Sequence, residues 1–162
     1  MIKVLFVCHG NICRSPMAEF IFKDMVKARG REDDFLIRSC ATSSEEIIGG
    51  RGNPVYPPAR RELLRHGIDS GDKRAVQLTR ADYVRYDHLI AMDEQNLRMM
   101  DCILGGDPDG KIALLLSFAG EARSVDDPWY TGDFAAAYRD IERGCAALLN
   151  RLLARGACLL YT

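Results

Sequence analysis

The apolar residues of this chain follow two alternating patterns, short continuous runs and longer stripes at helical spacing. Short continuous runs are typical of strands that are covered on both faces, whereas apolar residues that recur every three or four positions indicate helices. The runs predict strands at 4–7, 35–37, 88–92 and 112–116. The stripes predict helices at 16–29, 59–66, 80–86, 94–103 and 134–154.

Strands that alternate with helices predict an α/β fold with a parallel sheet and helices on both of its faces. The segments 43–58 and 120–133 are rich in Gly, Pro or Asp and are expected to be loops. Ligands of such sheets bind beyond the carboxyl ends of the strands. Cys8, Ser39 and Asp93 lie at predicted strand ends and are therefore expected on one rim.

Composition and charge narrow the classes of partner. Residues 1–162 are expected to form a single domain, and this length is enough to bury a core. The net charge is −1, so no general attraction to nucleic acid or anionic lipid is expected. The sequence shows neither a secretory signal nor an apolar run near the ~20 residues of a membrane helix, so no membrane insertion is expected. The six cysteines leave a disulfide framework open, but a cytoplasmic protein with reduced thiols is favoured.

The most informative segment follows the first predicted strand. Cys8 and Arg14 are separated by five residues, among them Gly10 and Asn11, which tolerate left-handed backbone angles. Such a loop can point successive N–H groups at an anion, and the next helix, expected to start at a Ser15 cap, adds its positive end. Arginine can hold two phosphate oxygens in a fork, and the same dipoles favour a thiolate over a thiol. The segment therefore predicts a phosphate-binding site with a nucleophilic cysteine.

The segment 7–19, Val-Cys-His-Gly-Asn-Ile-Cys-Arg-Ser-Pro-Met-Ala-Glu, resembles the signature of the low-molecular-weight protein tyrosine phosphatases. Further motifs of that family match in the expected order at 39–43, 65–68, 92–97 and 127–130. The resemblance covers essentially the whole chain and implies a four-stranded parallel sheet flanked by helices, with the phosphate-binding loop after the first strand. It also implies phosphotyrosine-containing proteins as partners, and by analogy a bacterial tyrosine kinase among them.

The resemblance assigns three catalytic residues. Cys8 attacks phosphorus and forms a phosphocysteine, Arg14 binds the phosphate, and Asp127, just before Pro128, is the general acid and then the base that activates water. A tyrosyl leaving group has a conjugate acid of pKa ~10 and gains a factor of about 10²–10⁴ from protonation, so such an acid is needed. The alternative for Asp127 is a solvated turn. No metal and no other cofactor is expected, because the loop supplies the charge stabilisation that a metal would give.

Supporting roles follow from the resemblance. The family holds its loop with a network of Asn, Ser, Ser and His, and the matching positions are Asn11, Ser15, Ser39 and His66. The alternative for His66 is a histidine that meets the dipole at a helix end. Asp93 resembles a rim aspartate of the family, although helix capping alone would explain it.

The remaining candidate residues lie in the loop and on the rim. Cys13 matches a second family cysteine that could trap an oxidised Cys8 as a disulfide, and the alternative is a small buried residue. His9 occupies a position that the family varies, so no chemistry is assigned to it. The other residues expected to bind substrate or support the loop are Gly10, Ile12, Trp129 and Tyr130.

The sequence leaves two other functions open. An arsenate reductase shares this fold and loop, but it needs a close pair of extra cysteines, and the chain offers only the scattered Cys40, Cys102, Cys145 and Cys158. A non-catalytic phosphate-binding module is disfavoured by the presence of all three catalytic residues. A related branch that hydrolyses phosphoarginine carries Thr where this chain has Ile12.

One departure from the family concerns the rim. Many members carry an aromatic residue where this chain has Glu45, and the following segment 47–52 looks longer than usual. An acidic residue here is expected to disfavour acidic flanks of a substrate. The sequence leaves open the oligomeric state and the role of the apolar tail 158–162.

Overall fold

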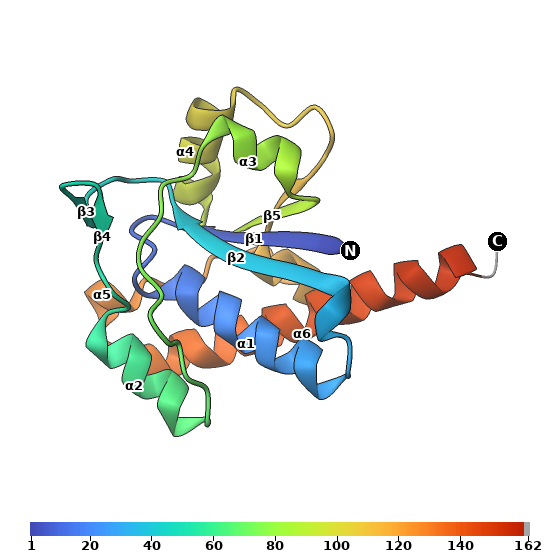
Figure 1. Cartoon of the computed structure of the whole chain (residues 1–162), viewed down its shortest axis with the longest axis horizontal. Coiled ribbons are helices and arrows are strands. Elements are labelled where there is room, and N and C mark those ends of the chain that lie inside the picture. Colours follow the sequence, from blue (N-terminus) through green and yellow to red (C-terminus); the bar gives the residue numbers. More distant parts are fainter. Residues whose placement is uncertain (161–162) are drawn as a thin grey trace.

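A four-stranded parallel sheet forms the centre of the protein. Its strands, in spatial order, are β2 (Phe35–Ala41), β1 (Ile2–Cys8), β5 (His88–Ala91) and β6 (Ile112–Leu114). All three neighbouring pairs are parallel, and helices cover both faces of the sheet (Figure 1). The structure is a computed structural model, which describes residues 1–160, with side chains through Arg155. The predicted α/β class and four-stranded parallel sheet are confirmed.

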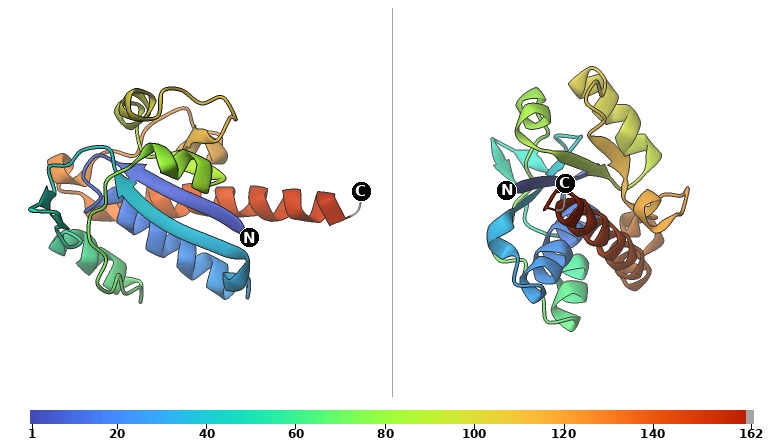
Figure 2. Two further views of the ribbon diagram at one scale, coloured as in Figure 1. Left: turned by 45° about the horizontal axis from the view of Figure 1, so that its top comes forward. Right: turned by 90° about the vertical axis from the view of Figure 1, so that its right-hand side faces the viewer.

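The alternation of side chains along β1 explains why both faces need helices. Val4 and Phe6 belong to one buried cluster, whereas Leu5 and Val7 belong to a second cluster on the other face. The first cluster lies under α1 (Arg14–Ala28), α2 (Pro57–Arg65) and α6 (Phe134–Leu160). The second lies under α3 (Arg80–Arg85) and α4 (Glu94–Leu104), and the two layers are separated in Figure 2.

Aromatic contacts anchor α1 to the sheet. The rings of Phe6 and Phe22 meet edge to face with centroids 5.5 Å apart, and Phe22 meets Phe35 in the same way at 5.8 Å. This geometry suits the charge distribution of aromatic rings and adds to the burial of their apolar area. These contacts hold α1, which directly follows the Cys8 loop, against β1 and β2.

The strand order places the loop after β1 at a point where the chain changes direction. From β1 the chain goes to β2 on one side, and it later reaches β5 on the other side. Loops that leave neighbouring strands in opposite directions open a crevice at the carboxyl end of the sheet. Cys8 is the last residue of β1, and Asp93 follows shortly after the end of β5, so both border this crevice.

Several predicted boundaries differ from the structure. The first helix begins at Arg14 with Cys13 as its N-cap, so Ser15 lies inside the helix and is not its cap. The strand predicted at 112–116 ends at Leu114, where the chain continues as a short 3₁₀ helix, η2 (Leu115–Ala119). The last helix extends beyond residue 154 to Leu160. The 3₁₀ turn η1 (Glu32–Asp34) precedes β2.

Two short elements lie inside segments that were predicted to be loops. The first is a hairpin of β3 (Ile47–Ile48) and β4 (Arg51–Gly52), joined by a two-residue turn. Both turn residues, Gly49 and Gly50, have positive φ, as the tight turns that suit hairpins require. The second element is α5 (Pro128–Thr131), with a proline at its first position.

Among the helices that the structure describes, none combines the length and the apolar character needed to cross a membrane. The apolar tail 158–162, noted in the sequence, lies outside the residues whose side chains are described.

The hairpin is expected to depend on Gly52, which packs directly on the backbone of the segment between α2 and α3. A Cβ atom at Gly52 would overlap the carbonyl oxygen of Ala75 and lie 2.8 Å from its nitrogen. The Gly52→Ala variant should therefore lose about 1–3 kcal/mol in urea unfolding, since a backbone neighbour cannot rotate away. Arg51→Ala, at an exposed neighbouring position, should stay within about 0.5 kcal/mol of the parent. Equal stability of the two variants would contradict this packing.

Candidate active site

The loop after β1 curls around the sulfur of Cys8. The backbone N–H groups of Asn11 and Ser15 donate to Cys8 Sγ at 3.3 and 3.4 Å. Asn11 has a φ of 59°, a left-handed conformation that asparagine tolerates better than most side chains. This turn aims successive donors at one point and, together with the start of α1, favours negative charge there.

Side chains extend this set of donors into a buried network. Ser15 Oγ lies 2.9 Å from Cys8 Sγ, and Asn11 Nδ2 donates to Ser15 Oγ at 2.8 Å. Asn11 Nδ2 also donates to Ser39 Oγ at 2.9 Å, and Asn11 Oδ1 accepts from the N–H of Val76 at 3.0 Å. Three of the four residues predicted for the supporting network, Asn11, Ser15 and Ser39, are therefore brought together.

The fourth predicted member, His66, lies elsewhere. Its ring stacks on Tyr138 with centroids 3.7 Å apart and an interplanar angle of 7°, and its Nε2 is 3.4 Å from Glu62 Oε1. His66 is the C-cap residue of α2, a helix that packs on α6, so its side chain points toward α6. The assignment of His66 to the loop network is corrected, and the alternative of a helix-end histidine describes its position.

Two residues that the sequence reasoning missed complete the network. Ser39 Oγ donates to Glu19 Oε1 at 2.6 Å, and Lys73 Nζ donates to the carbonyl oxygen of Ser39 at 2.9 Å. Glu19 lies four residues after Ser15 on α1, so helical spacing could have placed the two on one face of that helix. Lys73 gave no local signal, because its contacts join residues more than thirty positions apart.

Arg14 is held behind the loop by the neighbouring strand end. Its Nη1 donates to Asp93 Oδ2 at 2.7 Å and to the carbonyl oxygen of Val125 at 2.9 Å, and its Nη2 lies 3.4 Å from Asp127 Oδ2. Burial disfavours the charged guanidinium, but Cys8, Asp127 and Asp93 outweigh it and raise the pKa of Arg14. The site therefore keeps a fixed cation beside the sulfur.

Asp93 serves two structural purposes at once. Its Oδ1 accepts from the N–H of Asn96 at 2.7 Å and caps α4, while its Oδ2 holds Arg14. The sequence left two interpretations of Asp93 open, a helix-capping residue and a rim aspartate, and its contacts agree with both.

Asp127 lies across the mouth of the site on a loop that is tied to β5. The N–H of Val125 donates to the carbonyl oxygen of Met92 at 2.8 Å, which fixes this loop to the end of that strand. Asp127 caps α5, because its Oδ1 accepts from the N–H of Trp129 at 3.0 Å. Its other oxygen faces Arg14, so the carboxyl group is oriented rather than free in a solvated turn.

A pocket opens above Cys8, with the loop as its floor. Its lining includes three acidic side chains and two aromatic side chains. The Trp129 ring packs on Tyr56 with centroids 4.8 Å apart, while Tyr130 is 83% exposed. The residues that line the pocket are Cys8, His9, Gly10, Ile12, Cys13, Arg14, Glu45, Glu46, Asp127, Trp129 and Tyr130. An anion-binding floor below aromatic walls suits a phosphate attached to a planar ring.

The other cysteines differ from Cys8 in their surroundings. Burial raises the pKa of the Cys13 thiol well above its usual range, and the nearby Cys8 and Asp127 raise it further. Cys40 and Cys145 are buried, and burial also raises the pKa of each thiol. Cys102 is exposed, and Cys158 lies outside the described side chains. The described cysteines besides Cys8 and Cys13 lie on three different elements, β2, α4 and α6.

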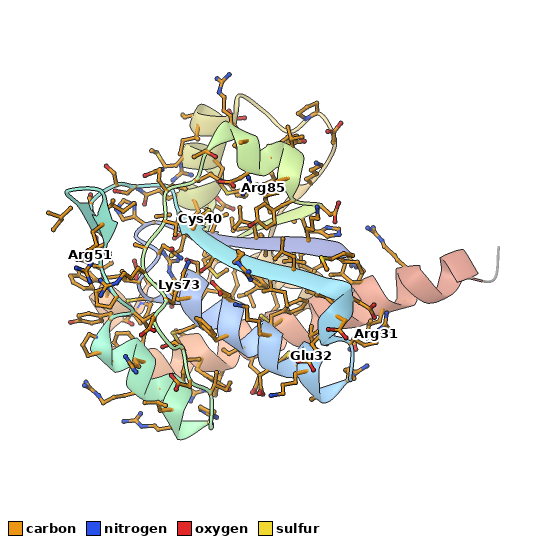
Figure 3. All side chains as sticks on the ribbon, in the orientation of Figure 1. Arg31, Glu32, Cys40, Arg51, Lys73 and Arg85 are labelled. Atoms are coloured by element: carbon orange, nitrogen blue, oxygen red, sulfur yellow. The ribbon has the colours of Figure 1, made fainter. Side chains whose placement is uncertain are left out.

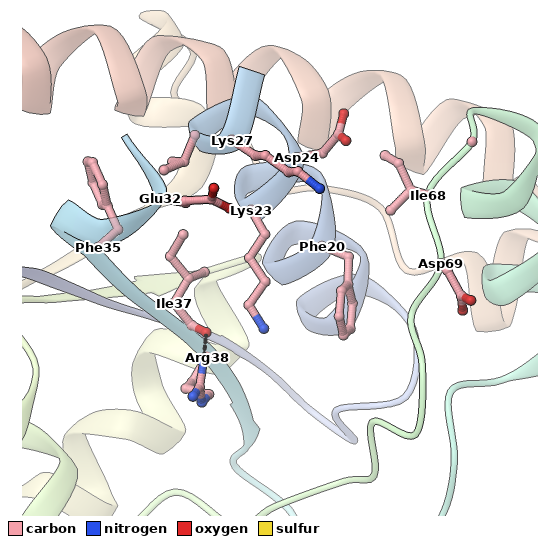
Figure 4. Close-up of a pocket in the computed structure, with 12 residues that line it drawn as sticks. Phe20, Lys23, Asp24, Lys27, Glu32, Phe35, Ile37, Arg38, Ile68 and Asp69 are labelled. Carbon is pink, nitrogen blue, oxygen red and sulfur yellow. Dashed lines mark hydrogen bonds between the residues drawn. The ribbon is translucent and has the colours of Figure 1, made fainter. Parts of the chain in front are cut away.

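A larger hollow of about 440 Å³ lies beside α1 and β2 (Figure 4). It shares no lining residue with the Cys8 pocket, and it mixes basic residues such as Lys27 with acidic residues such as Asp24 and Glu32. Its walls show no convergence of donors comparable with the Cys8 loop, so the chemistry is assigned to the smaller pocket.

Comparisons with known proteins agree with this geometry. The family model described as low molecular weight phosphotyrosine protein phosphatase matches residues 3–157. The chain is 37% identical to the low molecular weight protein-tyrosine-phosphatase YfkJ of Bacillus subtilis, with 92% of this chain and 94% of that protein covered. It is also 37% identical to the low molecular weight phosphotyrosine protein phosphatase of Sus scrofa, with 93% and 95% covered.

Solved structures give the same result. The crystal structure of YfkJ superposes with a TM-score of 0.85 and 35% identity, covering 96% of each chain. The low molecular weight protein tyrosine phosphatase SP-PTP of Streptococcus pyogenes superposes with a TM-score of 0.82 and 38% identity, covering 94% of this chain and 93% of that chain.

The left-handed turn and the amide of Asn11 can be tested separately. Asn11→Gly keeps the backbone conformation but removes the amide, so inorganic phosphate should bind about ten-fold more weakly, a loss of ~1.4 kcal/mol. Asn11→Ala loses both features, and it should unfold about 1 kcal/mol more easily than Asn11→Gly, because Ala is strained at positive φ. Calorimetric titration and urea unfolding give the two quantities. Parent-like phosphate binding by Asn11→Gly would show that the amide network is dispensable.

Proposed function

The chain belongs to the low molecular weight phosphotyrosine protein phosphatase family, and we propose that it hydrolyses phosphotyrosine in proteins through a phosphocysteine intermediate on Cys8. The observation that carries this mechanism is the set of donors around Cys8 Sγ, two backbone N–H groups and the Ser15 hydroxyl. Donors around a sulfur at a helix N-terminus favour the thiolate, which is the nucleophilic form of cysteine.

In the first step, the phosphate group of the substrate binds above the loop. The N–H groups and the Arg14 guanidinium face its oxygens, and the aromatic walls flank the tyrosyl ring. Cys8 Sγ attacks phosphorus in line with the tyrosyl oxygen, so an S–P bond forms as the P–O bond to tyrosine breaks. The charge that develops on the phosphoryl oxygens meets donors that are already in place, which lowers the barrier.

The leaving tyrosyl oxygen takes its proton from Asp127. This residue is on the pocket wall, and the Trp129 N–H and Arg14 hold its two oxygens in a defined orientation. A phenolate is a poor leaving group at neutral pH, so proton transfer in the transition state accelerates the step. Asp127 is then a carboxylate, ready for the second step.

In the second step, Asp127 removes a proton from a water molecule, which attacks phosphorus and breaks the S–P bond. Inorganic phosphate is released, and the sulfur leaves as a thiolate. The Ser15 hydroxyl, 2.9 Å from Cys8 Sγ, stabilises the departing sulfur. The two steps regenerate Cys8 and Asp127 in their starting forms, so the sum is hydrolysis of the phosphoester.

The partners that follow from this reaction are phosphotyrosine-containing proteins, with a bacterial tyrosine kinase as one candidate. A reaction that depends on a reduced Cys8 fits the cytoplasm, where thiols are kept reduced. Arsenate reduction is a weaker alternative, because Cys40 and Cys145 are buried on separate elements and do not form a ready relay. A role in phosphate binding alone would not require a carboxyl group oriented as that of Asp127 is.

The roles of Cys8 and Asp127 can be separated by the leaving group of the substrate. Cys8→Ser should abolish turnover of every aryl phosphate, because the nucleophile is lost. Asp127→Asn should lower kcat by about 10²–10⁴ for phenyl phosphate, whose leaving group needs a proton, and far less for para-nitrophenyl phosphate. Steady-state kinetics on the two substrates give the ratio. An equal loss of kcat on both substrates would show that Asp127 is not the general acid.

The acidic wall of the pocket should set a preference among phosphopeptides. Glu45 is exposed, and its Oε2 lies 3.1 Å from His9 Nε2 at the pocket edge. Phosphotyrosine peptides with basic flanks should react a few-fold faster than those with acidic flanks, and added salt should reduce the difference. Glu45→Gln should reduce this preference, whereas Glu142→Gln on the exposed face of α6 should preserve it. Equal kcat/KM for the two peptide classes with the parent protein would refute the idea.

A further inference from the structure

The network behind Cys8 ends at a buried carboxylate, Glu19, which is 2% exposed. A buried carboxylate is costly unless cations and hydrogen-bond donors face it. Glu19 Oε2 contacts Lys23 Nζ at 2.5 Å, and Glu19 Oε1 lies 3.7 Å from Lys73 Nζ. Glu19 Oε1 also accepts from Ser39 Oγ at 2.6 Å. Two lysines and one hydroxyl therefore compensate its charge.

The charge on Glu19 sets the direction of the Ser39 hydrogen bonds, and the Asn11 amide continues this direction to Ser15. A carboxylate can only accept, so the single hydroxyl proton of Ser39 goes to Glu19, and Ser39 Oγ accepts from Asn11 Nδ2. The second Nδ2 proton of Asn11 goes to Ser15 Oγ. The hydroxyl proton of Ser15 then has two acceptors, Cys8 Sγ at 2.9 Å and the carbonyl oxygen of Cys40 at 3.4 Å, and the shorter contact is to the sulfur.

The orientation of the Asn11 amide is fixed from the other side. Its Oδ1 accepts from the N–H of Val76, which lies on the segment between α2 and α3. This segment runs beside the end of β2, since the N–H of Ala41 donates to Val76 and the N–H of Leu78 donates to Ala41. The same segment carries Lys73, which is labelled in Figure 3. One stretch of chain therefore supports both ends of the network.

Lys73 and Lys23 differ in what they can do for Glu19. The Lys23 side chain is 35% exposed and projects into the hollow beside α1 (Figure 4), where water and salt weaken its effect. The Lys73 side chain is 11% exposed, and its Nζ also holds the carbonyl oxygen of Ser39. Burial lowers the pKa of Lys73, and the neighbouring Glu19 partly opposes this effect. Burying the ammonium group of Lys73 is unfavourable, and the fold accepts this cost where Lys73 contacts Glu19 and Ser39.

We propose that Lys73 is a positioning residue for the Cys8 nucleophile, acting through Glu19 and Ser39. Its ammonium group offsets the charge of Glu19 and pins the backbone of Ser39, which keeps the donors of Asn11 and Ser15 directed at the sulfur. This role rests on the proposed function of Cys8. Without Lys73, the carboxylate of Glu19 keeps only the partly exposed Lys23 as its cation, so more of its negative charge acts on the loop and a thiolate at Cys8 becomes harder to form.

The test compares Lys73→Met with Lys111→Met. Lys111 is a matched control, because it is also partly buried and its Nζ donates to a backbone carbonyl, that of Tyr83, at 2.8 Å. The rate of Cys8 carboxymethylation by iodoacetate, followed by mass spectrometry across pH, reports thiolate formation without any turnover. Lys73→Met should move the inflection of this profile up by about one pH unit and lower kcat for para-nitrophenyl phosphate several-fold. Lys111→Met should reproduce the parent profile.

A rescue separates electrostatics from packing. In Lys73→Met/Glu19→Gln the carboxylate charge is gone and a Gln oxygen can still accept from Ser39, so the inflection should move back toward the parent value. Lys73→Gln, which keeps a donor for Ser39 without the charge, should also show the upward shift and serves if the Met variant does not fold.

The proposal is overturned if the Lys73 variants lose thermal stability while their alkylation profiles match that of Lys111→Met. It is also overturned if the double variant shifts no less than Lys73→Met. A failure of the proposed function gives a different result, because Cys8→Ser would then retain hydrolysis in an otherwise unmodified protein.

Discussion

The structure depends on one electrostatic constraint, the stabilisation of negative charge at the end of β1. A thiolate and a phosphate group are both anions, and bringing them together is unfavourable unless donors and cations are already in place. The N–H groups of Asn11 and Ser15, the Ser15 hydroxyl and Arg14 supply them here. All of these groups are buried or oriented by partners, so little reorganisation is needed when charge develops.

The fold supplies that preorganisation from several directions. The parallel sheet brings the ends of β1, β2 and β5 to one edge, and each end contributes to the site. The loop follows β1, and β2 contributes the hydroxyl of Ser39. The turn after β5 contributes the carboxylate of Asp93, which holds Arg14. The site is thus built on rigid elements. Behind it, the contact between Glu19 and Lys73 connects α1 to the segment between α2 and α3. Precise placement of catalytic groups requires such support.

The sequence predicted the parts of this arrangement that are local. The spacing of four residues in one short segment already indicates a loop around an anion, namely Cys8, Asn11, Arg14 and Ser15. Ser15 was assigned both to the loop network and to the helix cap. The structure agrees with the first assignment and not with the second, because the Ser15 hydroxyl contacts Cys8 and Asn11 and the helix begins at Arg14. The hairpin turn at Gly49 and Gly50 carried a recognisable signal that the overall richness of the segment in Gly and Pro obscured.

The parts that were not predicted depend on contacts between distant residues. His66 fitted a family motif in the sequence, yet its place at the end of α2 directs it to Tyr138. Lys73 had no motif at all, and only the pairing of its segment with β2 brings it to Ser39. Periodicity and spacing describe neighbours along the chain, whereas the second layer of a site is set by how the elements pack.

The central claim, that Cys8 carries the phosphoryl group during turnover, is tested most directly by rapid acid quenching of the parent protein during reaction with an aryl phosphate. Mass spectrometry of the digested protein should find phosphate on the peptide that contains Cys8, at a level that rises before steady-state product release. Product formation with no phosphate on Cys8, or with phosphate on another side chain, would contradict the account.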